Sequence, residues 1–193
     1  SNAFDKVIDR VTDTILDDLK LDNINQGVNP WGVFDHHLLD RAIDIIDENP
    51  STKPIFLSIL TTTNHLPWII PENYKNDIIN HKSNGKDFNL SKNTIQYVDK
   101  SLRKFFEKSE DKPWFDNTIF ILTADHGLNI YKKHINDPRN GRIPFLIYST
   151  ALNENNIKSY NKCVSQIDIL PTLIDLISIG ENHNSNSFYG SSG

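Results

Sequence analysis

Three short, uninterrupted apolar runs constrain the fold of this chain most strongly. They cover residues 54–61, 118–124 and 142–149, and none of them alternates polar with apolar side chains. Such runs are typical of strands that are buried on both faces of a sheet. Helical patterns separate the runs, so we expect an α/β domain whose sheet is mainly parallel and is flanked by helices.

Apolar residues at alternating spacings of three and four predict the helices. The predicted helices cover residues 4–19, 35–49, 91–109 and 168–178. Asp35 is a candidate N-cap for the second helix, and Asp168 lies near the start of the last one, with Pro171 in its first turn. The polar segment 71–90 is predicted to be a long surface loop.

Length, charge and cysteine content exclude several classes of protein. The chain has 193 residues, of which 37% are hydrophobic, which suits one soluble domain or part of a larger one. Its net charge is −5 and no basic stripe recurs along any predicted element, so nothing in the sequence suggests a nucleic-acid surface. One cysteine cannot form an internal disulfide, and no run of 18 apolar residues is present to span a membrane.

The two ends of the sequence indicate a piece of a longer protein. Residues 1–3, Ser-Asn-Ala, look like the remnant of an expression tag, and the chain contains no Met. We therefore expect the native protein to continue upstream of Phe4. Residues 4–193 are interpreted as the C-terminal portion of one domain, and targeting segments could lie upstream of it.

Two of the apolar runs end in side chains that can bind metal. Asn64 and His65 follow the first run, and Asp125 and His126 follow the second, in the stretch "FILTADHGLN". If the strands are parallel neighbours, these side chains lie at the same edge of the sheet, where α/β proteins bind ligands. Oxygen and imidazole ligands suit Zn²⁺ or Mn²⁺, and Gly127 would allow a sharp turn. An Asp-His pair in a helix cap or a turn is the alternative, and one Asp with two His is too few to complete a four-coordinate site.

Five blocks of sequence, in order, resemble the alkaline-phosphatase superfamily. They are "WGVFDHHLLDRAIDII", "PIFLSILTTTNHLPW", "DNTIFILTADHG", "RIPFLIYS" and "QIDILPTLIDLI". The chain is most similar to the sulfatase-like branch, which includes lipoteichoic acid synthases and other phosphoglycerol or phosphoethanolamine transferases. The resemblance covers most of residues 31–178.

The resemblance implies a metal-dependent active site that this chain supplies in part. Asp125 and His126 match the metal-binding Asp-His pair of the family. His65 matches a catalytic His that lies near the metal and contacts the transferred group or the leaving oxygen. The family's nucleophilic Thr (Ser or formylglycine in relatives) and its acidic metal ligand lie upstream of the first block, and Thr61, Thr62 and Thr63 belong to a different motif.

By the same resemblance, the whole protein is expected to hold one divalent ion, Mn²⁺ or Zn²⁺ rather than Ca²⁺, and to hydrolyse or transfer a phospho- or sulfo-ester group. Its substrate would be a phosphorylated or sulfated ester, which could be lipid-linked. We expect a membrane anchor and a location on the extracytoplasmic face of the bacterial cytoplasmic membrane. This chain alone is expected to bind metal poorly and to be inactive. The alternative is a non-catalytic binding or scaffolding module on the same fold.

Other polar residues are weaker candidates for the site. His134, in the loop after the Asp-His pair, and Arg142, before the third run, could contact an anionic substrate. The alternatives are a solvated loop histidine and a surface arginine that pairs with a carboxylate. Asp168 is interpreted as structural, because a carboxylate at a helix start accepts hydrogen bonds from free N–H groups. Trp31 and Trp68 are interpreted as packing residues, and no G-x-S-x-G motif of a serine hydrolase is present.

Overall fold

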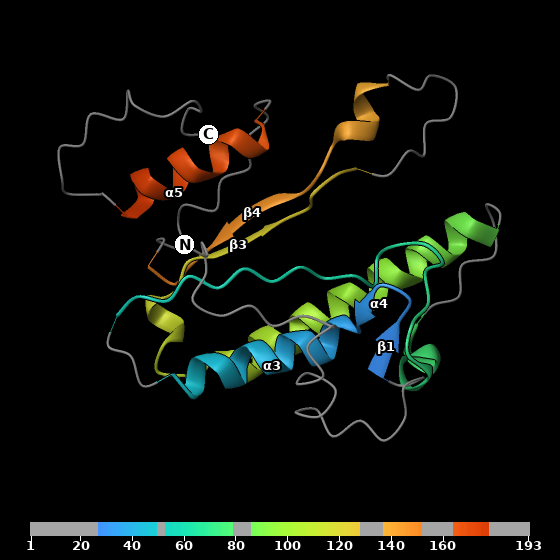
Figure 1. Ribbon diagram of the computed structural model, residues 1–193, viewed down its shortest axis with the longest axis horizontal. Helices are drawn as coiled ribbons and strands as arrows, with labels where there is room; N and C mark the ends of the chain where they lie inside the picture. The colour runs from blue at the N-terminus through green and yellow to red at the C-terminus, as the bar shows by residue number, and fades with distance from the viewer. Residues whose placement is uncertain (1–26, 50–52, 79–85, 128–136, 152–163, 178–193) are drawn as a thin grey trace. The chain divides into compact units, whose positions relative to one another are not determined.

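The computed structural model combines helices and strands, which confirms the α/β class (Figure 1). The chain divides into two units, residues 1–119 and 120–193, and each is described by itself. None of the described helices has both the length and the hydropathy that crossing a bilayer requires. The predicted helix at 4–19 lies outside the described residues. The structure describes residues 27–49, 53–78, 86–127, 137–151 and 164–177.

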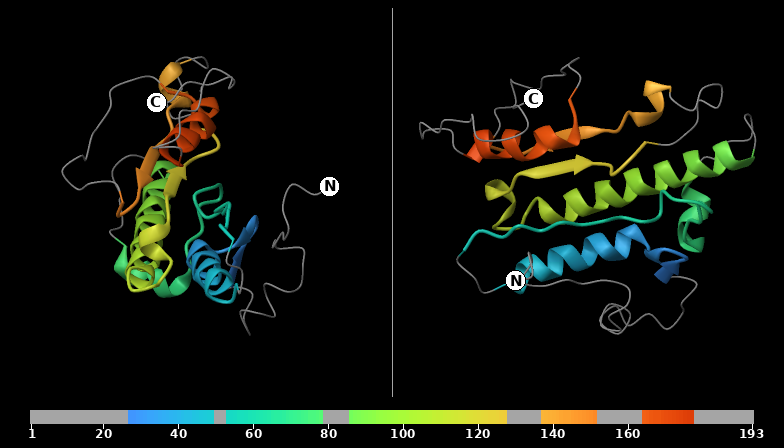
Figure 2. Two further views of the ribbon diagram at one scale, coloured as in Figure 1. Left: turned by 90° about the vertical axis from the view of Figure 1, so that its left-hand side faces the viewer. Right: turned by 45° about the horizontal axis from the view of Figure 1, so that its top comes forward.

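Two helices lying side by side form the first unit (Figures 1 and 2). They are α3 (Asp35–Asp47) and α4 (Lys86–Ser109). A small antiparallel ribbon, β1 (Val28–Asn29) with β2 (Gly32–Val33), leads into α3. Short 3-10 turns, η1 (Glu72–Asp77) and η2 (Phe115–Asn117), occur before and after α4. A cluster of four buried side chains, Phe34, Tyr74, Ile78 and Tyr97, lies in the core of this unit.

The helix predicted at 91–109 is confirmed, although it begins earlier, at Lys86, within the segment 71–90 that was predicted to be a loop. Its buried face also differs from the apolar pattern. Ile95 is exposed, whereas Thr94, Tyr97 and Ser101 are buried. These polar side chains are satisfied locally, because the Thr94 hydroxyl donates to the carbonyl of Ser91 and the Ser101 hydroxyl donates to the carbonyl of Tyr97. Burial of a hydroxyl is inexpensive when its hydrogen bond is made within the same helix.

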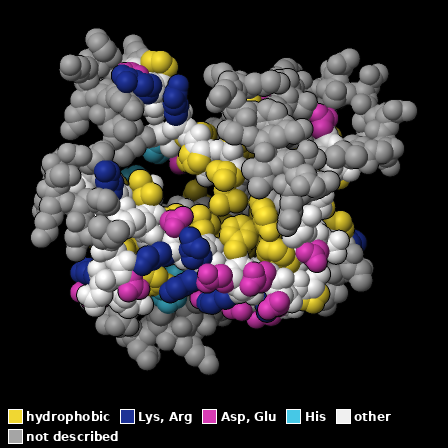
Figure 3. Space-filling model, turned by 180° about the vertical axis from the view of Figure 1, so that it is seen from behind, with side chains coloured by type: hydrophobic (Ala, Val, Ile, Leu, Met, Phe, Trp, Pro, Cys, Tyr) yellow, Lys and Arg dark blue, Asp and Glu magenta, His cyan; other side chains and the backbone are white. Residues whose placement is uncertain are grey.

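The prediction of a buried strand at residues 54–61 is wrong. No strand is assigned there, and the side chains of Phe56 and Leu60 are 72% and 73% exposed. Figure 3 shows hydrophobic side chains at the surface among Lys, Arg, Asp and Glu side chains. A strand exists only when a neighbour accepts its hydrogen bonds, and no described residue pairs with this segment. Local composition therefore identified an apolar segment but not its pairing.

The second unit contains a two-stranded sheet followed by a helix. Strand β3 (Phe120–Thr123) pairs with β4 (Phe145–Tyr148), with Phe120 opposite Tyr148 and Thr123 opposite Phe145. The 3-10 turn η3 (Pro138–Gly141) precedes β4, and η5 (Gln166–Asp168) leads into α5 (Ile169–Ile177).

The strand pairing corrects one part of the predicted topology. Both pairings that the structure describes are antiparallel, whereas we expected a mainly parallel sheet. Parallel neighbours need a crossover connection, which is usually a helix. Residues 124–144 carry no helical periodicity, so the connection between these two strands was already a signal for antiparallel pairing. The strands are also half-buried rather than fully buried.

Candidate functional site

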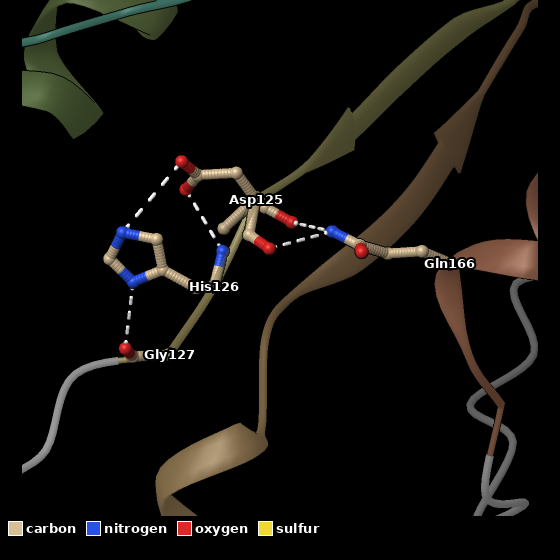
Figure 4. A network of polar contacts seen from close by, with 5 residues as sticks. Asp125, His126, Gly127 and Gln166 are labelled. Carbon is tan, nitrogen blue, oxygen red and sulfur yellow. Dashed lines mark hydrogen bonds and ion pairs between the residues drawn. The ribbon is translucent and has the colours of Figure 1, made fainter.

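The Asp125-His126 pair lies directly after the carboxyl end of β3, as the sequence predicts (Figure 4). Both side chains are exposed, 71% for Asp125 and 69% for His126. The backbone N–H of His126 donates to Asp125 Oδ1 at 2.9 Å, and His126 Nδ1 lies 2.9 Å from the carbonyl oxygen of Gly127. Because a carbonyl only accepts, Nδ1 is the donor in this contact, which leaves Nε2 as the ring nitrogen that can bind a metal in the neutral tautomer.

The spacing of the two atoms that remain, Asp125 Oδ2 and His126 Nε2, is compatible with coordination of one metal ion. His126 Nε2 lies 3.7 Å from Asp125 Oδ2. Two atoms that are each about 2.1 Å from an ion lie about 3.4 Å apart at a tetrahedral angle and about 4.2 Å apart when they are opposite each other. The observed separation falls between these limits. Across the part of the chain that the structure describes, no group of three or more His, Cys, Asp or Glu side chains gathers around a point. A metal site built on this pair would therefore need further ligands from outside the described residues.

Gly127 is required by close packing of the backbone. A Cβ atom at this position would lie 1.9 Å from the carbonyl oxygen of Asn140 and 3.2 Å from that of Arg142. The sequence suggested a glycine for a sharp turn, and the structure gives a more specific reason. The residues before β4 pass so close to the end of β3 that a side chain does not fit between them.

Gln166 holds the same turn from the other side, and sequence reasoning did not identify it. Its Nε2 donates to the carbonyl oxygens of Ala124 at 2.8 Å and Asp125 at 2.9 Å (Figure 4). Asp168 has the structural role that we expected, because its Oδ2 accepts the N–H of Ser165 at 2.8 Å in a capping box. The only sequence signal for Gln166 was its place as the first residue of the "QIDILPTLIDLI" block.

His65 lies in the first unit and is also exposed. Its Nδ1 lies 3.0 Å from the carbonyl oxygen of Leu66, so Nδ1 is the donor in this contact. Trp31 lies beside it, with ring centroids 4.3 Å apart, and the indole Nε1–H donates to the same Leu66 carbonyl. Trp31 is therefore a packing residue for His65, although half of its own surface is exposed.

A buried carboxylate supports the segment that carries His65. Oδ1 of Asp35 accepts hydrogen bonds from Thr62 N at 3.1 Å, Thr63 N at 3.0 Å and Thr63 Oγ1 at 2.7 Å. The prediction that Asp35 is the N-cap is wrong, because Phe34 occupies the cap and Asp35 is the first residue of α3. Burial raises the pKa of Asp35, and its Oδ2 has no hydrogen-bond partner in the described part of the protein. Next to this segment, the side-chain amide of Asn64 lies 3.0 Å from Thr94 Oγ1.

The other candidates stay predictions. His65 belongs to one unit and the Asp125-His126 pair to the other, so their meeting at one edge is not established. His134 lies outside the described residues. Arg142 is exposed, and its charge adds to the hydrogen bonds from Arg139 that hold the pKa of Asp137 at about 2. That contribution favours the alternative in which Arg142 interacts with a carboxylate of the protein.

Comparisons with known proteins place these features in context. The family model described as Sulfatase matches residues 1–179. A lipoteichoic acid synthase-like protein of Bacillus subtilis is 26% identical over 164 residues, which are 77% of this chain and 26% of that protein. Phosphoglycerol transferase I of Citrobacter koseri is 28% identical over 102 residues, which are 51% of this chain and 13% of that protein.

Two solved structures share the fold. A protein in the alkaline phosphatase superfamily from Vibrio parahaemolyticus has a TM-score of 0.63 and 28% identity, covering 78% of this chain and 35% of that one. The lipoteichoic acid synthase LtaP from Listeria monocytogenes has a TM-score of 0.71 and 19% identity. The match covers 86% of this chain and 43% of that one. The chain thus spans about a quarter of the length of two relatives from Bacillus subtilis: 26% of the lipoteichoic acid synthase-like protein and 27% of lipoteichoic acid synthase 2.

Proposed function

Because this chain belongs to the Sulfatase family, we propose that it supplies part of the active site of a metal-dependent enzyme that transfers or hydrolyses a phospho- or sulfo-ester. The observation that carries this proposal is the pair of ligand atoms at the end of β3, His126 Nε2 and Asp125 Oδ2, 3.7 Å apart. Both side chains are exposed and both are held by short local hydrogen bonds.

The residues of this chain have distinct roles in the proposed reaction. Asp125 and His126 would hold one divalent ion, Mn²⁺ or Zn²⁺, with further ligands from outside the described residues. When bound, the ion would neutralise charge on the ester oxygens and favour the alkoxide of a nucleophile. His65 would exchange a proton through Nε2 with the leaving or entering oxygen, because its Nδ1–H is engaged by Leu66.

The proposal extends to the whole protein of which this chain is a part. We propose that the nucleophile and an acidic metal ligand lie outside these 193 residues, so that the chain alone does not turn over. The names of the relatives support a phosphoglycerol-type, lipid-linked substrate. We further propose that a membrane anchor holds the whole protein at the extracytoplasmic face of the bacterial membrane.

Ester hydrolysis by the full-length protein tests this function. The assay uses p-nitrophenyl phosphate, p-nitrophenyl sulfate and a phosphatidylglycerol analogue, with Mn²⁺ or Zn²⁺ added. We expect Asp125→Ala to lower turnover at least about 100-fold and to weaken Mn²⁺ binding, and His65→Gln to lower kcat by about 10²–10⁴ without changing Mn²⁺ affinity. Asp111→Ala, at an exposed position in the first unit, is the control and should behave like wild type.

Two results would contradict the proposal. Turnover by the 193-residue chain alone, abolished by Asp125→Ala, would show that no outside nucleophile is needed. A full-length protein that binds Mn²⁺ through Asp125 but acts on none of the esters would instead favour a non-catalytic binding module.

A further inference from the structure

We infer that Gln166 is a positioning residue, which holds the Asp125-His126 turn in the orientation needed to bind a metal ion. This inference rests on the proposed function. Gln166 would not contact the ion or the substrate, and its effect would pass through the backbone of Ala124 and Asp125.

The turn needs an anchor because the strand ladder stops before it. The register of β3 and β4 ends where Thr123 lies opposite Phe145. The next two carbonyl groups, of Ala124 and Asp125, accept from the Gln166 side chain instead. A backbone carbonyl that has left a sheet must find another donor or water. Gln166 therefore prolongs the hydrogen bonding of β3 by two residues, up to the proposed metal ligand.

The chemistry of the side chain fits this role. A carboxamide carries two N–H donors on one nitrogen, and here they reach two successive carbonyl oxygens at 2.8 and 2.9 Å. A glutamate of the same length offers only acceptors when it is ionised and would repel both carbonyls. A leucine of similar size offers no donor, and asparagine is one methylene shorter, so it cannot hold both oxygens from the same backbone position.

Gln166 is itself held in place by the start of the helix that follows. It is the first residue of η5, between Ser165 and Asp168, whose side chains and backbone N–H groups form a reciprocal capping box. The η5 turn continues directly into α5, and Thr172 of that helix is buried. The turn after β3 is thus tied to a helix end that has its own hydrogen bonds.

Fixing the Asp125 backbone has a consequence for its carboxylate. Oδ1 accepts the N–H of His126 at 2.9 Å, which directs Oδ2 toward His126 Nε2. Gly127 on the far side is held against the backbone of Asn140 and Arg142. With both ends of the turn fixed, the two ligand atoms keep their separation before a metal arrives. Preorganisation of this kind raises affinity because less motion is lost on binding.

Two measurements on the full-length protein test this role. Amide hydrogen exchange of a peptide that covers residues 124–127 reports on the turn without any metal. Titration with Mn²⁺, followed by the electron paramagnetic resonance of the free ion, reports on binding. For Gln166→Leu and Gln166→Glu we expect exchange at least about threefold faster and a Kd for Mn²⁺ about tenfold higher, with an unchanged Tm. Ile167→Val, at an exposed neighbouring position, is the control and should match wild type.

The outcomes separate this inference from the proposed function. If wild type binds Mn²⁺ and both Gln166 variants bind it equally well, the inference is wrong and the proposed function stands. Unchanged exchange in the variants also overturns the inference, whatever the metal does. If wild type binds neither Mn²⁺ nor Zn²⁺, the proposed function fails, and faster exchange in the variants would still show that Gln166 holds the turn.

Discussion

Replacement of Asp35 by alanine should destabilise the first unit by about 3 kcal/mol. Oδ1 of Asp35, a residue with 0% exposure, accepts three hydrogen bonds from Thr62 and Thr63. Each lost hydrogen bond contributes about 1 kcal/mol, and the buried N–H of Thr63 would be left without an acceptor, at a cost of about 1–3 kcal/mol. Relief of the buried carboxylate offsets part of this sum.

Replacement by asparagine separates the hydrogen bonds from the charge. Asp35→Asn keeps an oxygen at Oδ1 and places an NH₂ group where Oδ2 has no described partner, so we expect a loss of about 1 kcal/mol at pH 7. Burial raises the pKa of Asp35 in the folded state above the ordinary value of 3.8. The stability that protonated Asp35 gives the folded state is therefore fully present below the unfolded-state pKa of 3.8. It is lost as the pH rises through the raised pKa of the folded state. The penalty of Asp35→Asn should accordingly be larger at pH 4 than at pH 7.

Urea denaturation followed by tryptophan fluorescence measures these effects. All three tryptophans, Trp31, Trp68 and Trp114, lie in the first unit, so the signal reports on its unfolding. Asp99→Ala, at an exposed position of α4, is the control and should stay within about 0.5 kcal/mol of wild type. The reasoning is refuted if Asp35→Ala also stays within that limit, or if Asp35→Asn is as damaging as Asp35→Ala at both pH values.

Three further predictions concern His36, Gly127 and Trp31. Burial lowers the pKa of His36 to about 3, and the charges of His37, Lys104 and Lys108 add to this effect. The free energy of unfolding should therefore fall as the pH drops from about 6.5 toward 3, by roughly 0.5–1 kcal/mol per pH unit after allowance for the partial exposure of His36. In urea titrations, His36→Gln should remove this dependence on pH. Gly127→Ala should destabilise the β3–β4 pair by about 2 kcal/mol, because the added Cβ would overlap the carbonyl of Asn140. Amide hydrogen exchange in both strands should become faster, and exchange as slow as in wild type would contradict the close approach. Trp31→Phe keeps an aromatic ring beside His65 but removes the N–H that donates to the Leu66 carbonyl. NMR should then show a shifted His65 ring signal with little change in the free energy of unfolding. An unshifted signal would argue against this contact.

The features that the sequence predicted correctly are those set by local interactions. Helices α3, α4 and α5 follow from apolar spacing because helical hydrogen bonds join residues four apart. The position of Asp125 and His126 at the end of β3 follows for the same reason, since an apolar run stops where polar residues begin. Asp168 was also interpreted correctly, because a capping box joins residues three apart.

The features that were missed depend on contacts between distant segments. Whether the apolar segment 54–61 forms a strand depends on a neighbour, and its composition cannot supply one. Asp35 resembled an N-cap, yet it binds Thr62 and Thr63 in a segment about 27 residues away in sequence. Gln166 acts on Ala124 and Asp125 from about 41 residues away, and a glutamine in a sequence carries no sign of such a partner.

The most direct test of the central claim is anomalous X-ray diffraction from crystals of the full-length protein grown with Mn²⁺. The account predicts one strong manganese peak that lies within coordination distance, about 2.2 Å, of both Asp125 Oδ2 and His126 Nε2. It also predicts that the peak disappears in His126→Ala crystals prepared in the same way. A peak coordinated by other residues, with Asp125 and His126 pointing into solvent, would contradict the account.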